Sequence, residues 1–243
     1  MSLAGPIPLP CRMPSKILLI ETSTSLCSVA LAAGGRIVAS RESDHPRAHA
    51  SLTAPFVKEV LDSQGLAASG LDAVCVSAGP GSYTGLRVGV STAKGICFAA
   101  GIPLLSVGTL EVLFHQAAAE GLLPERCRYV IPLIDARRME VYTAVFTPDG
   151  QRLTEVDPRI VDAESFRSER EAGPVLFIGD GVDKCRESLA GPGVHFVQTC
   201  PRASAMLVPA MRAFEAGRFE DTAYFEPFYL KQFVATVSQK RLF

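Results

Sequence analysis

The hydrophobic pattern of the first hundred residues predicts three strands followed by alternating helices and strands. Residues 16–22 form a short, almost wholly apolar run, which is typical of a buried central strand. Residues 26–33 and 36–43 are two further predicted strands, joined by Gly34-Gly35 as a two-residue hairpin turn. Apolar residues at four-residue spacing then predict a helix over 48–63, in which Pro55 requires either a start near Thr53 or a bend.

The remaining elements follow the same alternation, and two halves of similar element order indicate a duplicated architecture. Three hairpin-linked strands followed by α/β crossovers predict, as fold class, an α/β protein with a mixed sheet covered by helices. Further strands are predicted at 71–78, 103–107, 129–134, 140–147, 152–156 and 175–178. Further helices are predicted from the glycine loop to about residue 100, at 108–120, up to residue 189, and at 203–216.

Composition narrows the class of protein. With 243 residues and 48% of them hydrophobic, the chain can bury a large core, which excludes disorder of the whole chain. A net charge of −1 does not favour a stand-alone nucleic-acid binder. Only 20% of the residues are charged, so part of the apolar surplus is expected to serve a partner. Seven cysteines without a CxxC pair indicate reduced thiols and a cytoplasmic protein.

The two ends of the chain are predicted to lie outside the core. Residues 1–14 contain three prolines and no apolar block, so we expect a disordered extension, with Met13 as a plausible natural start. The uncharged stretch 95–110 is too short and too interrupted by Gly and Pro to span a bilayer. No membrane association is expected.

The loop 79–85 is the most prominent candidate for chemistry. It follows a predicted strand and opens a predicted helix, where backbone N–H groups can bind a phosphate. It lacks the Lys-Ser/Thr of a P-loop and the spacing of the dinucleotide fingerprint, so a tight structural turn is the alternative. The helix after it carries a small residue once per turn, which allows close packing either on its own sheet or on another subunit.

Other candidate residues give weaker signals. His45 and His49 are four apart, but Pro46 lies between them and no third ligand or HExxH pattern is near, which favours polar surface histidines over a metal site. Asp135 and Arg137 end a buried-looking strand, a position where function often resides in α/β sheets. A surface ion pair is the simpler interpretation for them.

Taken together, the motifs resemble the TsaB family, formerly called YeaZ. The segments that carry the resemblance are 17–31 (ILLIETSTSLCSVAL), 47–57 (RAHASLTAPFV), 79–95 (GPGSYTGLRVGVSTAKG), 102–111 (IPLLSVGTLE), 134–146 (IDARRMEVYTAVF) and 226–236 (EPFYLKQFVAT). The GPGSxTGLRxG and DARRxEVY blocks are specific to this family. The resemblance runs in order over nearly the whole chain from residue 16.

The resemblance implies the duplicated fold of actin, Hsp70 and sugar kinases (ASKHA), with two subdomains that each hold a mixed β-sheet covered by helices. Residues 15–108 and 109–202 are the expected subdomains, the helix near 203–217 packs back on the first, and 218–243 form a tail. The implied function is a non-catalytic subunit in forming N6-threonylcarbamoyladenosine on tRNAs that read codons starting with A. The implied partners are TsaD and the ATPase TsaE, with a homodimer in isolation and tRNA contacted only through the complex.

The resemblance also assigns roles to residues. Thr109 and Leu113 stand where TsaD-like proteins carry two metal-binding histidines, so no catalytic residue and no metal site is expected. No cofactor is required by the chain alone, and ATP or ADP binding within the complex stays open. Glu21 keeps the acidic residue of the first phosphate loop of the fold. The candidates for a vestigial phosphate site are Thr22, Ser23, Thr24, Gly79, Gly81, Ser82 and Thr84.

The partner surface implied by the resemblance is built from the first two helices. Its residues are Arg47, His49, Leu52, Phe56, Val60, Gly85, Leu86, Gly89, Ala93 and Cys97. Asp135 and Arg137 are candidates for a cleft. Two enzyme classes remain as alternatives: a metallopeptidase of the glycoprotease type, and an ATP-binding kinase of the same fold with Asp135 as its acidic base.

Overall fold

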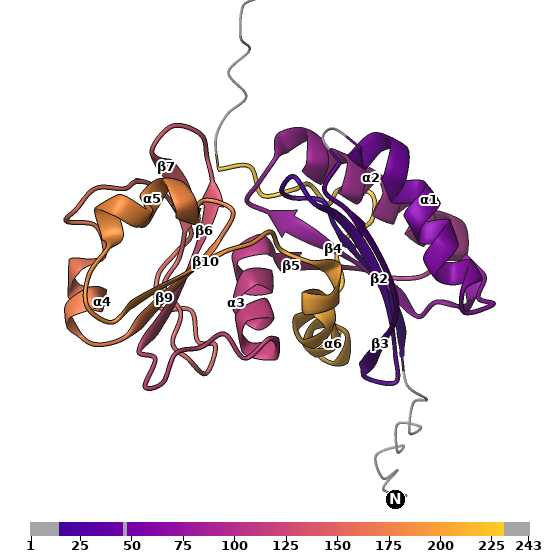
Figure 1. Ribbon diagram of the computed structural model, residues 1–243. Helices are drawn as coiled ribbons and strands as arrows, with labels where there is room; N and C mark the ends of the chain where they lie inside the picture. The colour runs from indigo at the N-terminus through magenta and orange to yellow at the C-terminus, as the bar shows by residue number, and fades with distance from the viewer. Residues whose placement is uncertain (1–14, 46–47, 231–243) are drawn as a thin grey trace, which may run out of the picture.

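Two five-stranded mixed sheets form the body of the protein. The computed structural model describes residues 15–45 and 48–230. The first sheet has the strand order β3-β2-β1-β4-β5 and the second the order β10-β9-β6-β7-β8. Figure 1 shows the two sheets side by side, with helices α3 and α6 between them and α1 and α2 on the far side of the first sheet.

The strands run over the apolar segments of the sequence. Those of the first sheet are β1 (Lys16–Glu21), β2 (Cys27–Ala33), β3 (Arg36–Ser43), β4 (Ala73–Gly79) and β5 (Leu104–Gly108). Those of the second sheet are β6 (Tyr129–Asp135), β7 (Glu140–Thr143), β8 (Asp157–Ile160), β9 (Val175–Gly179) and β10 (Val194–Gln198). Gly34 and Gly35 both have positive φ, as the two-residue turn between β2 and β3 requires.

Helices connect the parallel strands and cover both sheets. They are α1 (His49–Asp62), α2 (Tyr83–Ala100), α3 (Thr109–Ala119), α4 (Arg167–Glu171), α5 (Val182–Leu189) and α6 (Leu207–Glu215), with 3₁₀ turns at Ala68–Gly70 (η1) and Ala203–Met206 (η2). Pro55 lies within α1, so the helix begins before it. Ser82 caps α2 by accepting a hydrogen bond from the N–H of Gly85 at 3.3 Å.

The second half repeats the topology of the first. In each half the central strand (β1 or β6) pairs antiparallel with the next strand and parallel with the fourth (β4 or β9), and the fifth strand lies parallel beyond it. This duplication confirms the fold class expected from the resemblance.

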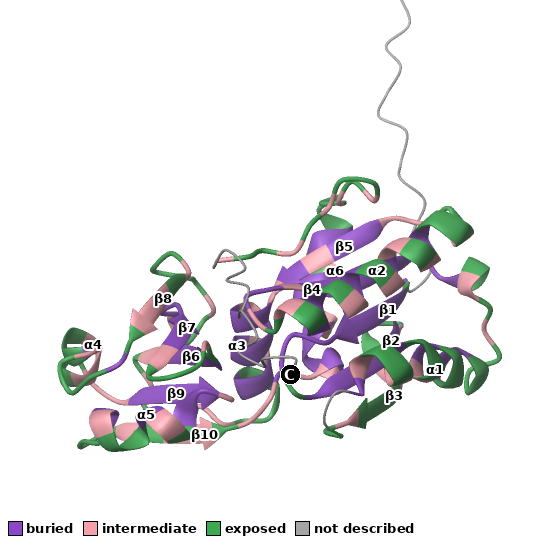
Figure 2. Cartoon of the chain, turned by 90° about the horizontal axis from the view of Figure 1, so that it is seen from above, coloured by how far each residue is buried: buried purple, intermediate pink, exposed green. Residues whose placement is uncertain are grey.

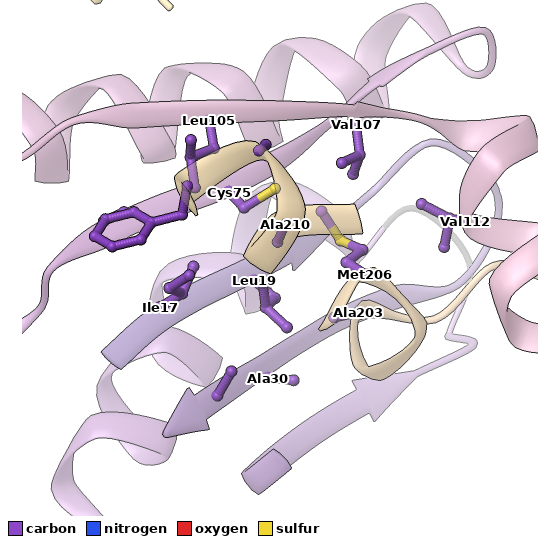
Figure 3. Close-up of a cluster of buried hydrophobic side chains, with 14 of the residues drawn as sticks. Ile17, Leu19, Ala30, Cys75, Leu105, Val107, Val112, Ala203, Met206 and Ala210 are labelled. Atoms are coloured by element: carbon purple, nitrogen blue, oxygen red, sulfur yellow. The ribbon is translucent and has the colours of Figure 1, made fainter. Parts of the chain in front are cut away.

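Alternate residues of β1 build two different cores, as the two-residue period of a strand requires. Leu18 and Ile20 point to α1 and α2. Ile17 and Leu19 point to the opposite face, where η2 and α6 supply Met206 and other buried residues (Figure 3). The first sheet is therefore completed by a helix almost two hundred residues later in the chain.

Three elements differ from the sequence prediction. The predicted strand at 152–156 is wrong: this segment makes only an isolated bridge between Phe146 and Arg152, and the strand β8 follows it. The edge strand β10 and the short helix α4 were not predicted. β10 is half exposed and α4 is highly charged, so neither carries a buried hydrophobic signal.

Three of the sequence predictions concern residues that the structure does not describe, and one concerns membrane-spanning helices. The expected disordered extension 1–14, the interface candidate Arg47 and the end of the tail lie outside the described residues. Within the described ranges, no helix is long and apolar enough to cross a membrane.

Candidate functional site

The two candidate phosphate loops lie together at the end of the first sheet, in direct contact with each other. The N–H of Ser82 donates to the carbonyl oxygen of Ser23 at 2.6 Å, and the hydroxyl of Thr22 donates to the carbonyl oxygen of Gly85 at 2.8 Å. A Cβ atom at Gly81 would lie 2.2 Å from the Ser23 carbonyl oxygen, so only glycine permits this approach. The contacts favour the structural-turn interpretation, because the loops bind each other.

Glu21 is fully buried beneath these loops. Its Oε1 accepts hydrogen bonds from the N–H of Ser23 at 2.7 Å and from the hydroxyl of Ser77 at 2.9 Å. Its Oε2 has no partner among the described residues. Burial raises the pKa of Glu21 from 4.5 to about 7, because desolvation disfavours the charged form more than the hydrogen bonds favour it. The acidic residue is therefore present, and a substantial fraction of it is protonated near neutral pH.

Thr109 and Leu113, the two positions that the resemblance aligned with metal-binding histidines, are buried. Thr109 begins α3 and is fully buried, and its hydroxyl has no partner in the described part of the chain. Leu113 is fully buried one turn later, in the core beneath the second sheet. Among residues 15–45 and 48–230, no group of three or more His, Cys, Asp or Glu side chains could hold a metal ion.

The small-residue ridge of α2 faces its own sheet, which corrects its assignment to a partner surface. A Cβ atom at Gly85 would lie 2.1 Å from the Thr22 carbonyl oxygen, and one at Gly89 would lie 2.3 Å from the Thr22 hydroxyl. The small residues let the helix approach β1 closely. The members of the predicted surface that are buried in this way are Gly85, Leu86, Gly89, Ala93 and Cys97, together with Val60 of α1.

The opposite faces of α1 and α2 reach solvent (Figure 2). Of the predicted surface, Leu52 and Phe56 are half-buried, and so is His49 at the start of α1. Phe98 of α2 is 87% exposed, although it is a large apolar residue. A Cβ atom at Gly95, one turn before it, would meet nothing within 4 Å. The exposed residues of this outward face include apolar and small ones, but also Arg87 of α2 and Lys58 and Glu59 of α1. The sequence pattern did not distinguish this face from the inward one.

Asp135 and Arg137 lie in the turn between β6 and β7. The Asp135 carboxylate accepts from the N–H of Arg137 at 2.8 Å and forms an ion pair with Lys184 of α5. Arg137 and Arg138 both have positive φ, at +70° and +52°. This conformation costs roughly 1 kcal/mol or more for a residue with a Cβ atom. The structure therefore places both predicted residues in one strained, solvent-exposed turn.

A half-buried acid, Asp180, faces this turn from just after β9. Asp180 follows Gly179, and its Oδ1 accepts from the N–H of Asp135 at 2.9 Å. Burial, with the nearby Asp135 charge as a smaller cause, raises the pKa of Asp180 from 3.8 to about 6. The charge of Asp180 also raises the pKa of Glu21, as the smallest of its causes.

The C-terminal segment 218–230 crosses the first sheet and reaches the second core, a feature that the sequence pattern did not predict. The N–H of Phe228 donates to the Ala78 carbonyl oxygen at 2.7 Å, and the Tyr229 ring lies 4.9 Å from the ring of Tyr83. Lys94 donates to two carbonyl oxygens of the segment. Leu230 packs against the core under the second sheet, so the segment joins both halves (yellow in Figure 1).

Comparison with protein families gives a match over more than half of the chain. Residues 37–168 match the family model described as "TsaD: tRNA N6-adenosine threonylcarbamoyltransferase". The "tRNA threonylcarbamoyladenosine biosynthesis protein TsaB" of Escherichia coli K12 is 31% identical over 230 residues, which cover 90% of this chain and 96% of that protein. The protein of the same name from Bacillus subtilis is 32% identical over 67% of this chain and 70% of its own length.

A solved structure gives the same result in three dimensions. YeaZ from Pseudomonas aeruginosa is similar with a TM-score of 0.79 and 29% sequence identity. The similarity covers 89% of this chain and 100% of the YeaZ chain. The relationship therefore includes both sheets and the helices between them.

Proposed function

This chain belongs to the TsaB family of tRNA threonylcarbamoyladenosine biosynthesis proteins, and we propose that it serves there as a non-catalytic subunit that docks a TsaD-type partner through the outward face of α1 and α2. The observation that carries the docking proposal is the exposure of Phe98 on that face. A large aromatic ring in water costs free energy that a partner's surface recovers. The ATPase TsaE is the proposed third member of the complex.

The outward face has the properties of a helix-packing surface. Leu52 and Phe56 of α1 and Val88 of α2 are half-buried, so each keeps apolar surface in contact with solvent. Gly95 leaves open space beside Phe98, which allows a partner helix to approach the backbone of α2. In isolation, we propose that two copies pair through the same face.

The non-catalytic role is supported by what replaces the histidines of TsaD-like proteins. Thr109 and Leu113 are buried at the start of α3, and a buried leucine offers no atom that can bind a metal. The proposed role of this chain is therefore to support a partner's active site. The proposed partner carries the transfer of the threonylcarbamoyl group.

A docking experiment tests the surface directly. The variant Phe98→Asp places a charge at the exposed position and is expected to abolish co-purification with a TsaD-type partner and homodimer formation, with the thermal midpoint unchanged. Leu153→Asp is a matched control, because Leu153 is an exposed apolar residue (47%) in the second half of the chain. It should leave both associations intact. Unchanged association of Phe98→Asp would refute the proposed surface.

A modification assay tests the role itself. A TsaD-type partner and TsaE, supplied with tRNA and substrates, should form threonylcarbamoyladenosine only when this chain is added. Full activity without the chain would contradict a required subunit. Activity of the chain alone would contradict the non-catalytic role.

A further inference from the structure

The turn between β6 and β7 presents two arginines side by side in an unfavourable backbone conformation. Arg137 and Arg138 have positive φ, and both side chains are exposed. Neither guanidinium takes part in an ion pair within the described ranges. The backbone is held by neighbouring contacts instead: the N–H of Arg137 donates to Asp135, and the N–H of Glu140 donates to the Arg137 carbonyl oxygen.

Elsewhere this chain uses glycine where the backbone turns left-handed. In the described residues, eleven glycines have positive φ and only four other residues do. Arg137 and Arg138 are two of these four, and they alone are adjacent. Glycine would adopt the same conformation without strain. What distinguishes this turn from Arg126 and Phe166 is that two neighbouring charged side chains both take the conformation.

Neither guanidinium forms an ion pair with the acids beside it in the part of the chain that the structure describes. Asp135 Oδ1 accepts from the Arg137 N–H and pairs with Lys184 of α5. Both guanidinium groups are exposed and can therefore meet an anionic group from outside the chain.

We infer that Arg137 and Arg138 bind phosphate groups of the tRNA backbone. A guanidinium is planar, always charged and suited to bidentate hydrogen bonding with phosphate oxygens. The inference rests on the proposed function, because tRNA is the phosphate-bearing partner of that function. Such contacts position the nucleic acid without reading its sequence. The chain thus contributes a local contact to tRNA, although its overall net charge is close to zero.

An acidic protein surface is the competing partner for this turn. Met139 and Ile160 beside the arginines are 39% and 73% exposed, and exposed apolar residues next to arginine also occur in protein interfaces. Phosphate is favoured because two adjacent exposed guanidinium groups can bind one anionic group together, whereas both apolar residues lie next to Glu140, whose charge would repel an acidic surface. The experiment below separates the two partners.

The experiment uses the complex of the full chain with its TsaD-type partner and measures tRNA affinity at several salt concentrations. The variant Arg137→Gly/Arg138→Gly removes both charges and the backbone strain together. We expect about tenfold weaker tRNA binding at low salt, and a slope of log affinity against log salt that is smaller by about 2. The thermal midpoint should stay the same or rise, which a purely structural role would not produce.

Arg126→Gly is the matched control. Arg126 is also exposed and has φ of +58°, but its Nε lies 3.9 Å from a carboxylate oxygen of Glu125. This variant should leave tRNA affinity and its salt slope unchanged. Arg137→Lys/Arg138→Lys keeps the charge and should restore most of the salt slope while binding more weakly than the arginine pair.

Three results would overturn the inference. Unchanged affinity and slope in the double-glycine variant would show that the turn contacts no phosphate. The double-glycine variant could instead bind the TsaD-type partner more weakly, while the fraction that still forms the complex shows an unchanged salt slope for tRNA. This result would identify the turn as a protein-docking surface. A wild-type complex that assembles yet neither binds nor modifies tRNA would overturn the proposed function and this inference together.

Discussion

The turn after β1 and the turn after β6 occupy equivalent places in the two halves of the chain, yet one turn is buried and the other is exposed to solvent. The turn after β1 is buried, with Glu21 beneath it and its hydroxyl-bearing residues packed against the glycine loop. The turn after β6 is open to solvent and carries Asp135 and two strained arginines. In the second half the acid with a raised pKa is instead Asp180, which follows β9 and is half-buried.

In both halves a glycine closely approaches the backbone of the central strand or of the turn after it. A Cβ atom at Gly81 would lie 2.2 Å from the Ser23 carbonyl oxygen, and a Cβ atom at Gly179 would lie 2.2 Å from the Leu133 carbonyl oxygen. The two positions differ, because Gly81 lies beyond β4 and meets the turn after β1, whereas Gly179 ends β9 and meets β6 itself. The side chains of the two turns differ as well: they are packed in one half and carry surface charge in the other.

The largest effect should come from adding a side chain where α2 comes closest to the turn after β1. Gly85→Ala places a methyl group 2.1 Å from the Thr22 carbonyl oxygen, so backbone must move. We expect a loss of about 3 kcal/mol or more in the free energy of unfolding, measured by chemical denaturation.

Gly95→Ala, in the same helix, is the control for that variant. Its added methyl group meets nothing within 4 Å. It should stabilise the protein by about 0.5–1 kcal/mol through helix propensity. Equal effects of the two substitutions would mean that α2 does not pack on β1 as described.

The buried acid of the first half should make stability depend on pH. Because the pKa of Glu21 is about 7 in the folded protein and 4.5 when unperturbed, the folded state retains a proton that the unfolded state releases between these values. The free energy of unfolding should therefore fall as pH rises from 4.5 to 7, by about 3 kcal/mol. Glu21→Gln should remove this fall.

Denaturation of wild type and variant across this pH range measures the difference. Glu155→Gln, at a side chain that is 94% exposed, should leave the pH curve of the wild type unchanged. Identical pH curves for wild type and Glu21→Gln would show that Glu21 is ionised in the folded protein and would remove the contrast between the two turns.

The acid of the second half should respond in a lower pH range and less strongly. The pKa of Asp180 is raised from 3.8 to about 6, and its carboxylate keeps some contact with solvent. Asp180→Asn can still accept from the Asp135 N–H, and it should remove a fall of about 2 kcal/mol between pH 3.8 and 6. If Asp180→Asn changed the pH dependence of the free energy of unfolding above pH 6 as much as Glu21→Gln does, the two acids would titrate as one coupled pair.

Much of the fold follows from sequence pattern because its strands are apolar runs between clear turns. β1, the Gly34-Gly35 hairpin and α2 were predicted within a few residues. The failures have physical causes. Strand β10 is half exposed and lacks an apolar run, and the segment before β8 forms one bridge in place of a ladder.

The candidate site could be predicted only in part. Spacing identified the small-residue ridge of α2 but not its direction, because a ridge at helical spacing suits an inward face as well as an outward one. The exposure of Phe98 depends on which face the sheet covers, and that is set by packing. The strained φ of Arg137 and Arg138 has no sequence signal, since positive φ is expected at glycine.

The position of α6 has a consequence for synthesis of the protein. Ile17 and Leu19 on β1 are covered by Met206 and Ala210, so one face of the first sheet stays open until residues 203–215 have emerged from the ribosome. The segment that is translated first is therefore completed last, after the second sheet has had time to form. During translation, the nascent chain exposes an apolar sheet face that α3 covers only in part, through Val112, until the C-terminal helix has been made.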